Sequence, residues 1–379
     1  MQTPDAAPSA RRPTIFLSAG DASGDLHAAA LVAELRARLP SARFVGFGGR
    51  AMREAGAELL APLADDPVMG FSAVLPALGR FARLLAAVDR SFADAPPDVV
   101  VPVDYPGFNV RLGRLARRRS IPVVYYVCPQ YWGWAPWRAR RFARSVDLGL
   151  TILPFEAPFL ARRGVRARHV GHPLADRLAA TPPATAAACS LGIVAGSRRR
   201  EIDHLLAWEL RAARRLMQAL GAAIPLLAAH PVAALRGRMA AIARAEGVAL
   251  EVRDQPLPEL LSTCRAALVT SGTATLECAL LRVPSVIVYR VNRLLLWASR
   301  YALTAPYIGL PNLLAGRALF PEHLCAGDPA PRLAADLEAL WREGAARDRC
   351  IEGLDRLRGR LLAPGATARA ADAILETMR

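Results

Sequence analysis

The stretch TSGTATLECALL, residues 270–281, joins an apolar run to a helix-forming segment through a Ser-Gly-Thr turn. The preceding letters RAALV predict a buried strand, so the whole stretch predicts a strand–turn–helix unit. The first-turn amides of a helix lack intrahelical partners and lie at the positive end of its dipole. We therefore expect Ser271, Gly272 and Thr273 to surround a phosphate group, with Glu277 near the ribose of the same nucleotide. The same pattern also occurs as a simple capped helix in α/β proteins. Other parts of the chain are therefore needed to decide whether this turn binds a phosphate.

Length and composition indicate a globular protein with two domains. The chain has 379 residues, of which 53% are hydrophobic and 22% charged. This length exceeds one typical core and suits two domains. No uncharged apolar run reaches the roughly 18 residues of a membrane span. The first residues, MQTPDAAPSARRPT, lack the apolar region of a secretory signal, so a cytoplasmic location is expected.

The net charge of +16 comes from arginine alone, since all 49 basic residues are Arg. Three arginine-rich runs, at 111–119, 138–144 and 161–168, would attract anionic lipid or phosphate. A bias in genomic composition explains the exclusive use of Arg better than selection for a nucleic-acid partner does. We therefore expect no nucleic-acid partner. The absence of Lys excludes a Lys Schiff base and a Walker A loop.

Cysteine and histidine give no metal-binding or disulfide pattern. The six Cys are scattered without a CxxC pair, and the six His form no HExxH or related set. We expect reduced thiols, no metal and no cofactor.

Apolar strands alternate with amphipathic helical stretches, which predicts doubly wound parallel sheets. Such sheets bind ligands beyond the carboxyl ends of their strands. The strand TIFLSAG is followed by Asp21, Ser23, Gly24 and Asp25, before a helix expected from about residue 27 to 39. Asp104 follows the strand DVVVPV. These residues are candidates for a site at the strand ends.

The segment TPPATAAACS, residues 181–190, has the prolines and small residues of a linker. It separates a predicted domain at 13–180 from a second at 190–350. The last stretch, 351–379, is expected to form a helix, which returns to the first domain in many folds of this kind.

The second domain opens with LGIVAGSRRREI, a strand that ends at Gly196 and Ser197 and leads into a helix at Arg198. The planar fork of an arginine can bind a diphosphate bidentately without a metal. Arg198 is therefore a candidate diphosphate ligand, whereas its two Arg neighbours are expected to be solvated.

A segment at 67–88 combines apolar residues with basic flanks, which is typical of a helix lying in a membrane interface. An ordinary core helix would show the same pattern. The residues expected to contact a membrane are Val68, Met69, Phe71, Val74, Leu75 and Leu78. The tryptophans of YWGWAPW, residues 131–137, would line a lipid-facing rim or fill space between the domains.

The chain resembles the lipid-A-disaccharide synthase family. The resemblance rests on eight blocks in order: AGDASGD (19–25), DYPGFN (104–109), YYVCPQYWGW (125–134), LPFE (153–156), VGHPLAD (170–176), AGSR (195–198), SGTATLE (271–277) and LPNLLAGR (310–317). They span nearly the whole chain.

The resemblance implies an inverting GT-B glycosyltransferase with two Rossmann-like domains facing across a cleft. Its substrates would be UDP-2,3-diacylglucosamine and 2,3-diacylglucosamine 1-phosphate. Its products would be lipid A disaccharide 1-phosphate and UDP. The protein would lie on the cytoplasmic face of the inner membrane as a peripheral protein. It assigns Asp104 as catalytic base and Arg198 as essential arginine. It also assigns Asn109 and Asn312 to the substrate site, the latter on the donor side, and the segment 67–88 to membrane association.

The chain departs from the family pattern in the acceptor and lipid-contacting blocks. The departures are Asp21 in place of Glu, Cys128, Gln130, Tyr131, Ala135 and Gly309. They leave open the acyl-chain length, the identity of the acceptor and a divergent paralogue. The sequence pattern does not decide domain closure or whether the protein forms a homodimer. Two other functions also stay open: a different UDP-sugar enzyme, such as another transferase or a 2-epimerase, and a noncatalytic arginine-rich membrane or nucleic-acid binder.

Overall fold

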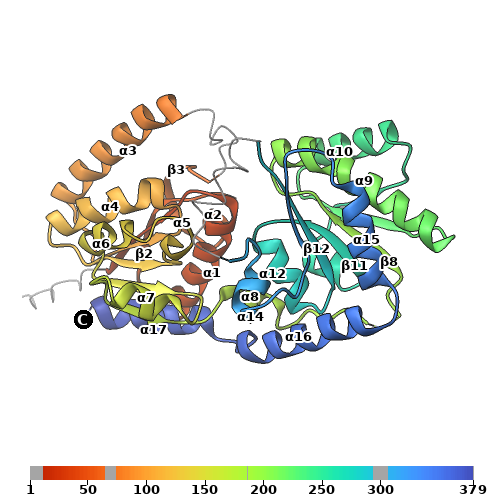
Figure 1. Cartoon of the computed structure of the whole chain (residues 1–379). Helices are drawn as coiled ribbons and strands as arrows, with labels where there is room; N and C mark the ends of the chain where they lie inside the picture. The colour runs from red at the N-terminus through yellow and green to blue at the C-terminus, as the bar shows by residue number, and fades with distance from the viewer. Residues whose placement is uncertain (1–11, 65–73, 186, 293–305, 379) are drawn as a thin grey trace, which may run out of the picture. The chain divides into compact units, whose positions relative to one another are not determined.

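The computed structural model describes residues 12–64, 74–185, 187–292 and 306–378. The chain divides into two compact units (Figure 1). Unit 1 comprises residues 1–173 and 364–379, and unit 2 comprises residues 174–363. The chain therefore passes from unit 1 to unit 2 after Pro173, a few residues before the predicted linker. Residues after it already belong to unit 2, where the amide of Ala184 donates to the carbonyl of Leu281 at 2.8 Å.

Unit 1 holds a seven-stranded parallel sheet in the order β3-β2-β1-β4-β5-β6-β7. Its strands are β1 (Thr14–Ala19), β2 (Arg43–Phe47), β3 (Glu58–Ala61), β4 (Val99–Val103), β5 (Val124–Tyr126), β6 (Leu148–Thr151) and β7 (Ala167–His169). Its helices are α1 (Ala22–Arg38), α2 (Arg50–Glu54), α3 (Val74–Asp94), α4 (Pro106–Arg118), α5 (Tyr131–Trp134), α6 (Arg138–Phe142), α7 (Glu156–Ala161) and α17 (Ala366–Met378), with a 3₁₀ turn at Ala143–Ser145.

Unit 2 holds a six-stranded parallel sheet in the order β10-β9-β8-β11-β12-β13. Its strands are β8 (Ser190–Val194), β9 (Leu226–Ala229), β10 (Glu251–Arg253), β11 (Cys264–Thr270), β12 (Ser285–Arg290) and β13 (Glu322–Cys325). Its helices are α8 (Pro173–Leu178), α9 (Arg199–Leu220), α10 (Ala233–Ala245), α11 (Leu257–Leu261), α12 (Thr273–Leu280), α14 (Leu310–Ala315), α15 (Ala330–Trp341) and α16 (Ala345–Leu361).

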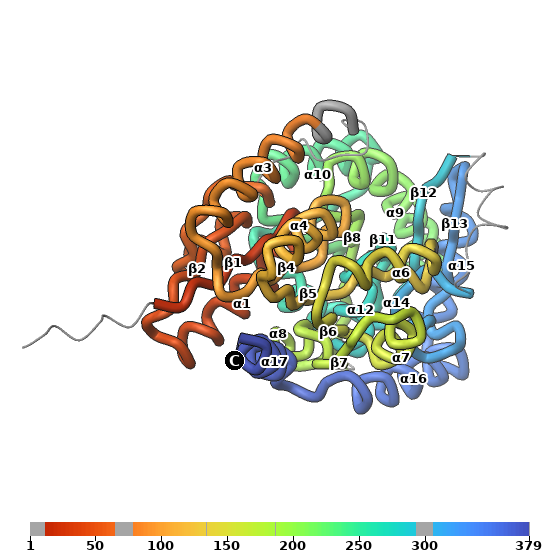
Figure 2. The backbone as a smooth tube through the Cα atoms, turned by 90° about the vertical axis from the view of Figure 1, so that its left-hand side faces the viewer, coloured from red at the N-terminus to blue at the C-terminus, as the bar shows by residue number. Residues whose placement is uncertain are grey.

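Continuous apolar strands form the middle of each sheet. Every residue of β4, VVVPV, is buried, because helices cover both faces of a parallel sheet. In unit 1 the core is rich in edge-to-face aromatic pairs, such as Phe16 with Phe47 at 5.6 Å between ring centroids. Figure 2 gives a second view of the parallel strands of β1, β4 and β5 side by side.

Helix α1 begins at Ala22, earlier than the residue 27 expected from sequence. The side chain of Asp21 accepts a hydrogen bond from the amide of Gly24 at 2.7 Å and so caps the helix. Ser23, Gly24 and Asp25 therefore lie in the first helical turn rather than in a loop.

The C-terminal stretch forms two helices where one was expected. Pro364 and Gly365 interrupt it, because proline removes a helical donor and Gly365 has φ +90°. Helix α16 belongs to unit 2, while α17 packs on α1 in unit 1 (Figure 1). The guanidinium of Arg369 fixes α17 by donating to the carbonyl of Val170 at 2.8 Å.

The segment expected at a membrane lies partly outside the described residues, since 65–73 are not described. Val68, Met69 and Phe71 fall there, and the side chains of Val74, Leu75 and Leu78 at the start of α3 are also outside the description. From Phe81 onward α3 buries one face, with the Phe81 ring 5.1 Å from that of Phe108, while most of its other residues keep exposed surface. None of the helices in the described part of the chain has the length and apolar character that crossing a membrane requires.

Candidate functional site

The strand order of unit 1 reverses between β1 and β4, which pair through Ala19 and Val103 at their carboxyl ends. Doubly wound sheets bind ligands at this point, because the flanking helices diverge there. Asp21 and Asp104 follow these two strands. The fold therefore brings two of the predicted site residues to the same edge of one sheet.

The backbone is strained where Asp104 stands. Asp104 and Tyr105 have φ values of 47° and 51°, and Val127, after the neighbouring strand β5, has 57°. The left-handed region is uncommon for side chains with a Cβ and most unfavourable for a β-branched residue. Each such residue costs about 1–3 kcal/mol, and such strain clusters at functional sites.

Asn109 holds the strained turn in place. Its fully buried side-chain amide donates to the carbonyl oxygens of Asp104 at 2.8 Å and Ser18 at 2.9 Å. Its side-chain oxygen accepts from the Ser18 hydroxyl at 2.6 Å. The Tyr125 hydroxyl donates a further bond to the Asp104 carbonyl at 2.5 Å. Asn109 thus ties the ends of β1 and β4 together and positions Asp104, with no exposed surface of its own.

The carboxyl of Asp104 is a weak acid in this setting. Burial, followed by the charge of Asp21, raises its pKa to about 7, and a hydrogen bond from the Tyr105 amide opposes the shift. The residue as a whole keeps some exposed surface. A carboxylate with a pKa near neutrality is suited to accept a proton.

The other residues of the first loop have local roles. The buried side chain of Asp25 accepts from the amides of Gly49 at 2.7 Å, Ala51 at 2.8 Å and Met52 at 3.2 Å, and so anchors the β2–α2 turn. The hydroxyl of Ser23 lies 3.4 Å from Nε2 of His27. Asp25 is therefore engaged inside the protein, while Asp21 and Ser23 keep exposed surface.

Unit 2 repeats the arrangement. Its strand order reverses between β8 and β11, which pair through Val194 and Val269. The loop 195–198 follows β8 and the loop 271–273 follows β11. The two predicted diphosphate-binding loops therefore lie at the same edge of one sheet.

The loop after β8 presents an exposed guanidinium. Gly196 has φ +105°, and a Cβ there would lie 2.4 Å from Oε2 of Glu201. That oxygen accepts from the amides of Ser197 at 3.1 Å and Arg198 at 3.2 Å. The Arg198 side chain is 70% exposed and contacts Glu201 at 3.4 Å. The helix start is thus already capped, and the Arg198 side chain projects from it.

The loop after β11 has the predicted strand–turn–helix geometry. Helix α12 begins at Thr273, after the exposed Gly272 and the partly exposed Ser271. Glu277 is buried in this helix, and its Oε1 accepts from Nη2 of Arg177 at 2.9 Å. Burial raises the Glu277 pKa more than Arg177 lowers it.

Asn312 is engaged within unit 2. Its fully buried side chain donates to the carbonyl of Phe320 and to Oε1 of Glu322, both at 2.7 Å, and accepts from the amides of Leu319 and Phe320. It holds the turn after α14. Asn312 would therefore affect binding of the donor substrate only through the backbone that it positions.

Three residues at these edges escaped the sequence interpretation. Glu156 follows β6, and Arg177 pairs with Glu277. His230 follows β9, with Nδ1 accepting from the Val232 amide at 3.0 Å and Nε2 lying 3.2 Å from the Ser197 carbonyl. A signal existed for Glu156 and His230, since both are polar residues directly after apolar runs.

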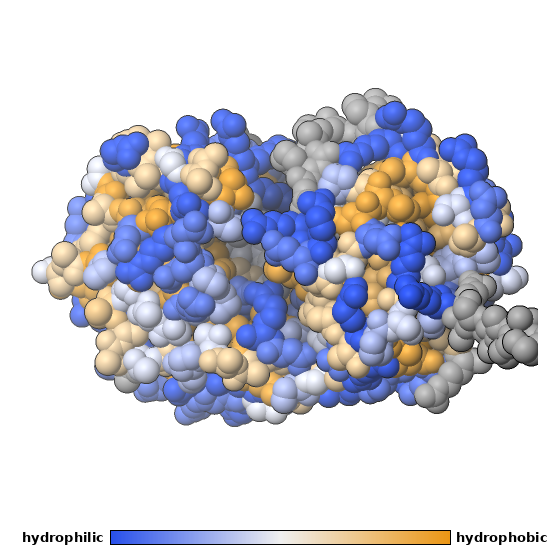
Figure 3. Space-filling view, turned by 180° about the vertical axis from the view of Figure 1, so that it is seen from behind, coloured by the Kyte–Doolittle hydropathy of each residue, from blue (hydrophilic) through white to orange (hydrophobic). Residues whose placement is uncertain are grey.

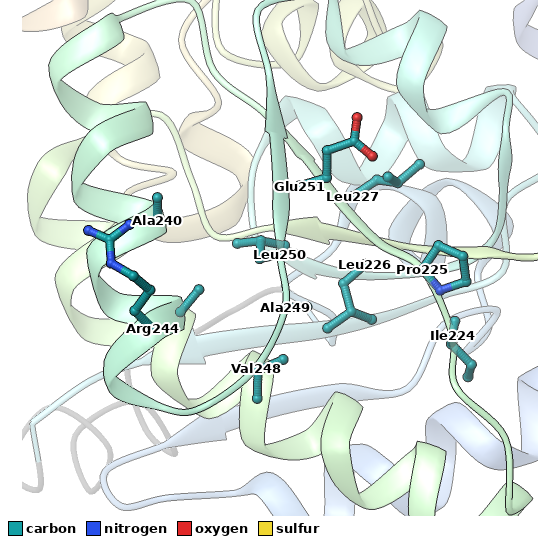
Figure 4. A pocket seen from close by; sticks show the side chains of 11 residues that line it. Ile224, Pro225, Leu226, Leu227, Ala240, Arg244, Val248, Ala249, Leu250 and Glu251 are labelled. Carbon is teal, nitrogen blue, oxygen red and sulfur yellow. The ribbon is translucent and has the colours of Figure 1, made fainter.

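Two grooves lie away from these edges. One, of about 480 Å³, lies between α10 and the starts of β9 and β10, with a mostly apolar lining that includes Leu226 and Val248 (Figure 4). The other, of about 550 Å³, is lined by Arg114, Arg117, Arg118, Arg141 and Arg144. Figure 3 shows hydrophilic residues interspersed with smaller hydrophobic areas on the visible face. Across the described ranges, no three His, Cys, Asp or Glu side chains come together as a metal site.

Comparison with solved structures defines the fold. The chain is similar to the glycotransferase of kitacinnamycin, with a TM-score of 0.66 and 19% identity over 98% of this chain and 100% of that one. It is also similar to CalG4, the calicheamicin glycosyltransferase, with a TM-score of 0.62 and 17% identity over 97% and 99%. A UDP-GlcNAc 2-epimerase from Neisseria meningitidis gives a TM-score of 0.64 at 11% identity, over 97% and 100%. The fold is GT-B, with two Rossmann-like parallel-sheet domains.

Sequence comparison gives the family. The family model for lipid-A-disaccharide synthetase matches residues 15–349. The lipid-A-disaccharide synthase of Myxococcus xanthus is 40% identical over 97% of this chain and 98% of its own length. That of Geobacter sulfurreducens is 34% identical over 96% and 97%. The chain belongs to the lipid-A-disaccharide synthase family, glycosyltransferases of lipid A biosynthesis.

Proposed function

We propose that the protein joins UDP-2,3-diacylglucosamine to 2,3-diacylglucosamine 1-phosphate, forming the β-1,6-linked lipid A disaccharide 1-phosphate and UDP with inversion at the anomeric carbon. Membership of the family supports the reaction. The observation that carries the mechanism is the strained, hydrogen-bonded turn that presents Asp104 at the switch point of unit 1.

Asp104 acts as the general base. Its carboxylate takes the proton of the acceptor 6-hydroxyl as that oxygen bonds to the anomeric carbon of the donor. The bond from this carbon to the UDP oxygen breaks, and UDP leaves with the electron pair. A pKa of about 7 leaves much of Asp104 ionised near neutrality while keeping it basic enough to accept the proton.

Unit 2 binds the UDP moiety. The guanidinium of Arg198 and the backbone amides of residues 271–273 contact the diphosphate and stabilise the charge that develops on it. Glu277 accepts hydrogen bonds from the ribose hydroxyls. The exposure of Arg198 and of Gly272 supports this assignment, since both stand at the sheet edge without being enclosed.

The protein works at the cytoplasmic face of the inner membrane, because both substrates carry acyl chains. Charge supports this location. The arginine groove includes one ion-paired member, Arg117 with Asp147 at 3.1 Å, whereas Arg118, Arg141 and Arg144 contact no carboxylate in the described ranges. Each such arginine near an anionic surface contributes about 1 kcal/mol to binding.

The test is UDP release from the donor, with and without acceptor, in detergent micelles containing EDTA. We expect release that depends on the acceptor, is lost in Asp104→Asn and persists in Asp89→Asn. Asp89 is a matched control because it is half-exposed and forms an ion pair with Arg119 on the surface. Full turnover by Asp104→Asn would exclude Asp104 as the base, and UDP release without acceptor would favour another UDP-sugar reaction.

A further inference from the structure

Glu156 is a buried carboxylate at the carboxyl edge of unit 1 that the proposed reaction does not use. It is 1% exposed. Oε1 accepts from the indole nitrogen of Trp132 at 3.0 Å, and Oε2 accepts from the amides of Ile152 at 3.2 Å and Leu153 at 3.0 Å. All three partners are donors, so the geometry matches an ionised carboxylate, which only accepts.

The position of Glu156 relates it to Asp104 through the sheet. Strand β4 pairs with β5 through Val103 and Tyr126, and β5 pairs with β6 through Tyr126 and Leu150. The residues after these strands therefore stand in a row along one edge. Glu156 holds Trp132, and with it the short helix α5, over the β5–β6 part of this row, where the Trp132 ring also packs on Phe155 at 5.1 Å.

The groups that titrate around this row are acidic or neutral. The charges of Asp21 and Glu156 both raise the pKa of Asp104, after burial. Burial raises the pKa of the Cys128 thiol, and the charges of Glu156 and Asp104 add to this shift. Burial also raises the pKa of the Tyr125 hydroxyl, and the charge of Asp104 is the next largest cause. Burial also raises the pKa of Glu156 to about 7, against the donors around it. Burial raises the pKa of the Tyr131 hydroxyl, and the charges of Arg138 and Arg114 oppose this shift.

We propose that Glu156 is a positioning residue for the transfer reaction: it fixes Trp132 beside the acceptor side of the sheet edge and adds a second carboxylate to the row of residues that contains Asp104. The inference rests on the proposed role of Asp104. It extends that role by giving the LPFE block a specific task.

Glu156→Gln removes the charge and keeps the size of the side chain. In the plot of kcat/KM against pH, we expect the rise on the acidic side to move to lower pH by roughly half a unit or more. This is the scale on which a nearby like charge shifts a pKa. Trp132→Phe removes the indole donor and keeps the Glu156 carboxyl group, so it tests the positioning of Trp132. It should raise the acceptor KM. Glu58→Gln is the control, since Glu58 is an exposed partner of Arg43, and it should change neither quantity.

A second readout does not depend on activity. In protein labelled with ¹⁵N-tryptophan, the Trp132 indole signal, assigned by its loss in Trp132→Phe, should titrate with Glu156. In Asp104→Asn the midpoint of this titration should fall, because the interaction of two charges is reciprocal. Turnover by Asp104→Asn would overturn the role of Asp104 as the general base. The indole titration would still report whether the charges of Glu156 and Asp104 interact. An unmoved titration midpoint in Asp104→Asn, or an unmoved rise of kcat/KM with pH in a folded Glu156→Gln, would overturn the inference.

Discussion

The ring of Tyr105 lies so close to Gly20 that a Cβ on Gly20 would stand 2.1 Å from its Cδ1 atom. Tyr105 is one of the two consecutive left-handed residues that present Asp104. A residue without a side chain at the end of β1 is therefore what allows the strained turn after β4 to close.

Gly20→Ala should displace the Tyr105 ring and the turn that contains Asp104. We expect turnover to fall by roughly a hundredfold, the size of effect that a 1 Å misplacement of a catalytic group produces. UDP release measures this loss. Gly359→Ala, in α16 with nothing within 4 Å of the new Cβ, is the control and should keep full activity. Wild-type turnover by Gly20→Ala would show that the ring position is irrelevant.

The pH dependence of the reaction should follow Asp104. Its pKa of about 7 predicts that kcat/KM rises with pH through neutrality, because only the ionised form accepts a proton. Asp21→Asn should move this rise to lower pH, since it removes the charge that most strongly raises the Asp104 pKa after burial. Asparagine caps a helix about as well as aspartate does, so α1 should stay intact. A rise at unchanged pH in Asp21→Asn would contradict the coupling.

Glu209, in α9, should make the protein less stable at alkaline pH. It is fully buried, and its two carboxyl oxygens have no hydrogen-bond partner within the described structure. Burial raises its pKa to about 8, above the ordinary value of 4.5. The folded state therefore binds a proton that the unfolded state releases, and the resulting stability, present in full below pH 4.5, is lost as the pH rises through 8.

Glu209→Gln removes this titration. We expect its free energy of unfolding to exceed that of the wild type above pH 8 by a few kcal/mol, at about 1.4 kcal/mol for each unit of pKa difference. Denaturant unfolding at pH 5, 7 and 9 measures the difference. Equal slopes of stability against pH in the two proteins would show that Glu209 does not ionise in this range.

Arg177→Met should weaken UDP binding at neutral pH. It removes the guanidinium that favours the ionised form of the buried Glu277, so the Glu277 pKa should rise further. We expect Kd for UDP to increase by about tenfold, the equivalent of one hydrogen bond of roughly 1.4 kcal/mol, and to recover partly as the pH is raised. Calorimetric titration gives Kd.

Arg342→Met is the matched control for that experiment. Arg342 pairs with Glu338 on the surface of the same unit, where an exposed ion pair contributes at most about 1 kcal/mol. Its UDP affinity should not change. If Arg177→Met binds UDP as tightly as the wild type at pH 7, Glu277 does not contact the nucleotide as a carboxylate.

Particular residues mark where sequence reasoning held and where it stopped. The alternation of apolar strands with helices predicted two parallel-sheet domains, because strands covered on both faces leave a continuous apolar pattern. Asp104 and Arg198 were predicted as site residues because each lies in the loop after such a strand, and their roles stay predictions. Asn109 and Asn312 stay predicted substrate-site residues, and the structure adds that both side chains are buried in internal hydrogen bonds. An asparagine in a motif reads the same in sequence whether it binds a ligand or holds a loop.

The sequence by itself determined the GT-B fold, the family and the strand ends at which polar residues gather, since these follow from local pattern and from motifs in fixed order. Only the tertiary structure decided the electrostatics. The raised pKa of Asp104 depends on burial, while the contact of Glu156 with Trp132 and the pairing of Glu277 with Arg177 join residues 24 and 100 positions apart. Such interactions arise when the chain packs, because removal of water and the approach of distant charges have no signature in local sequence.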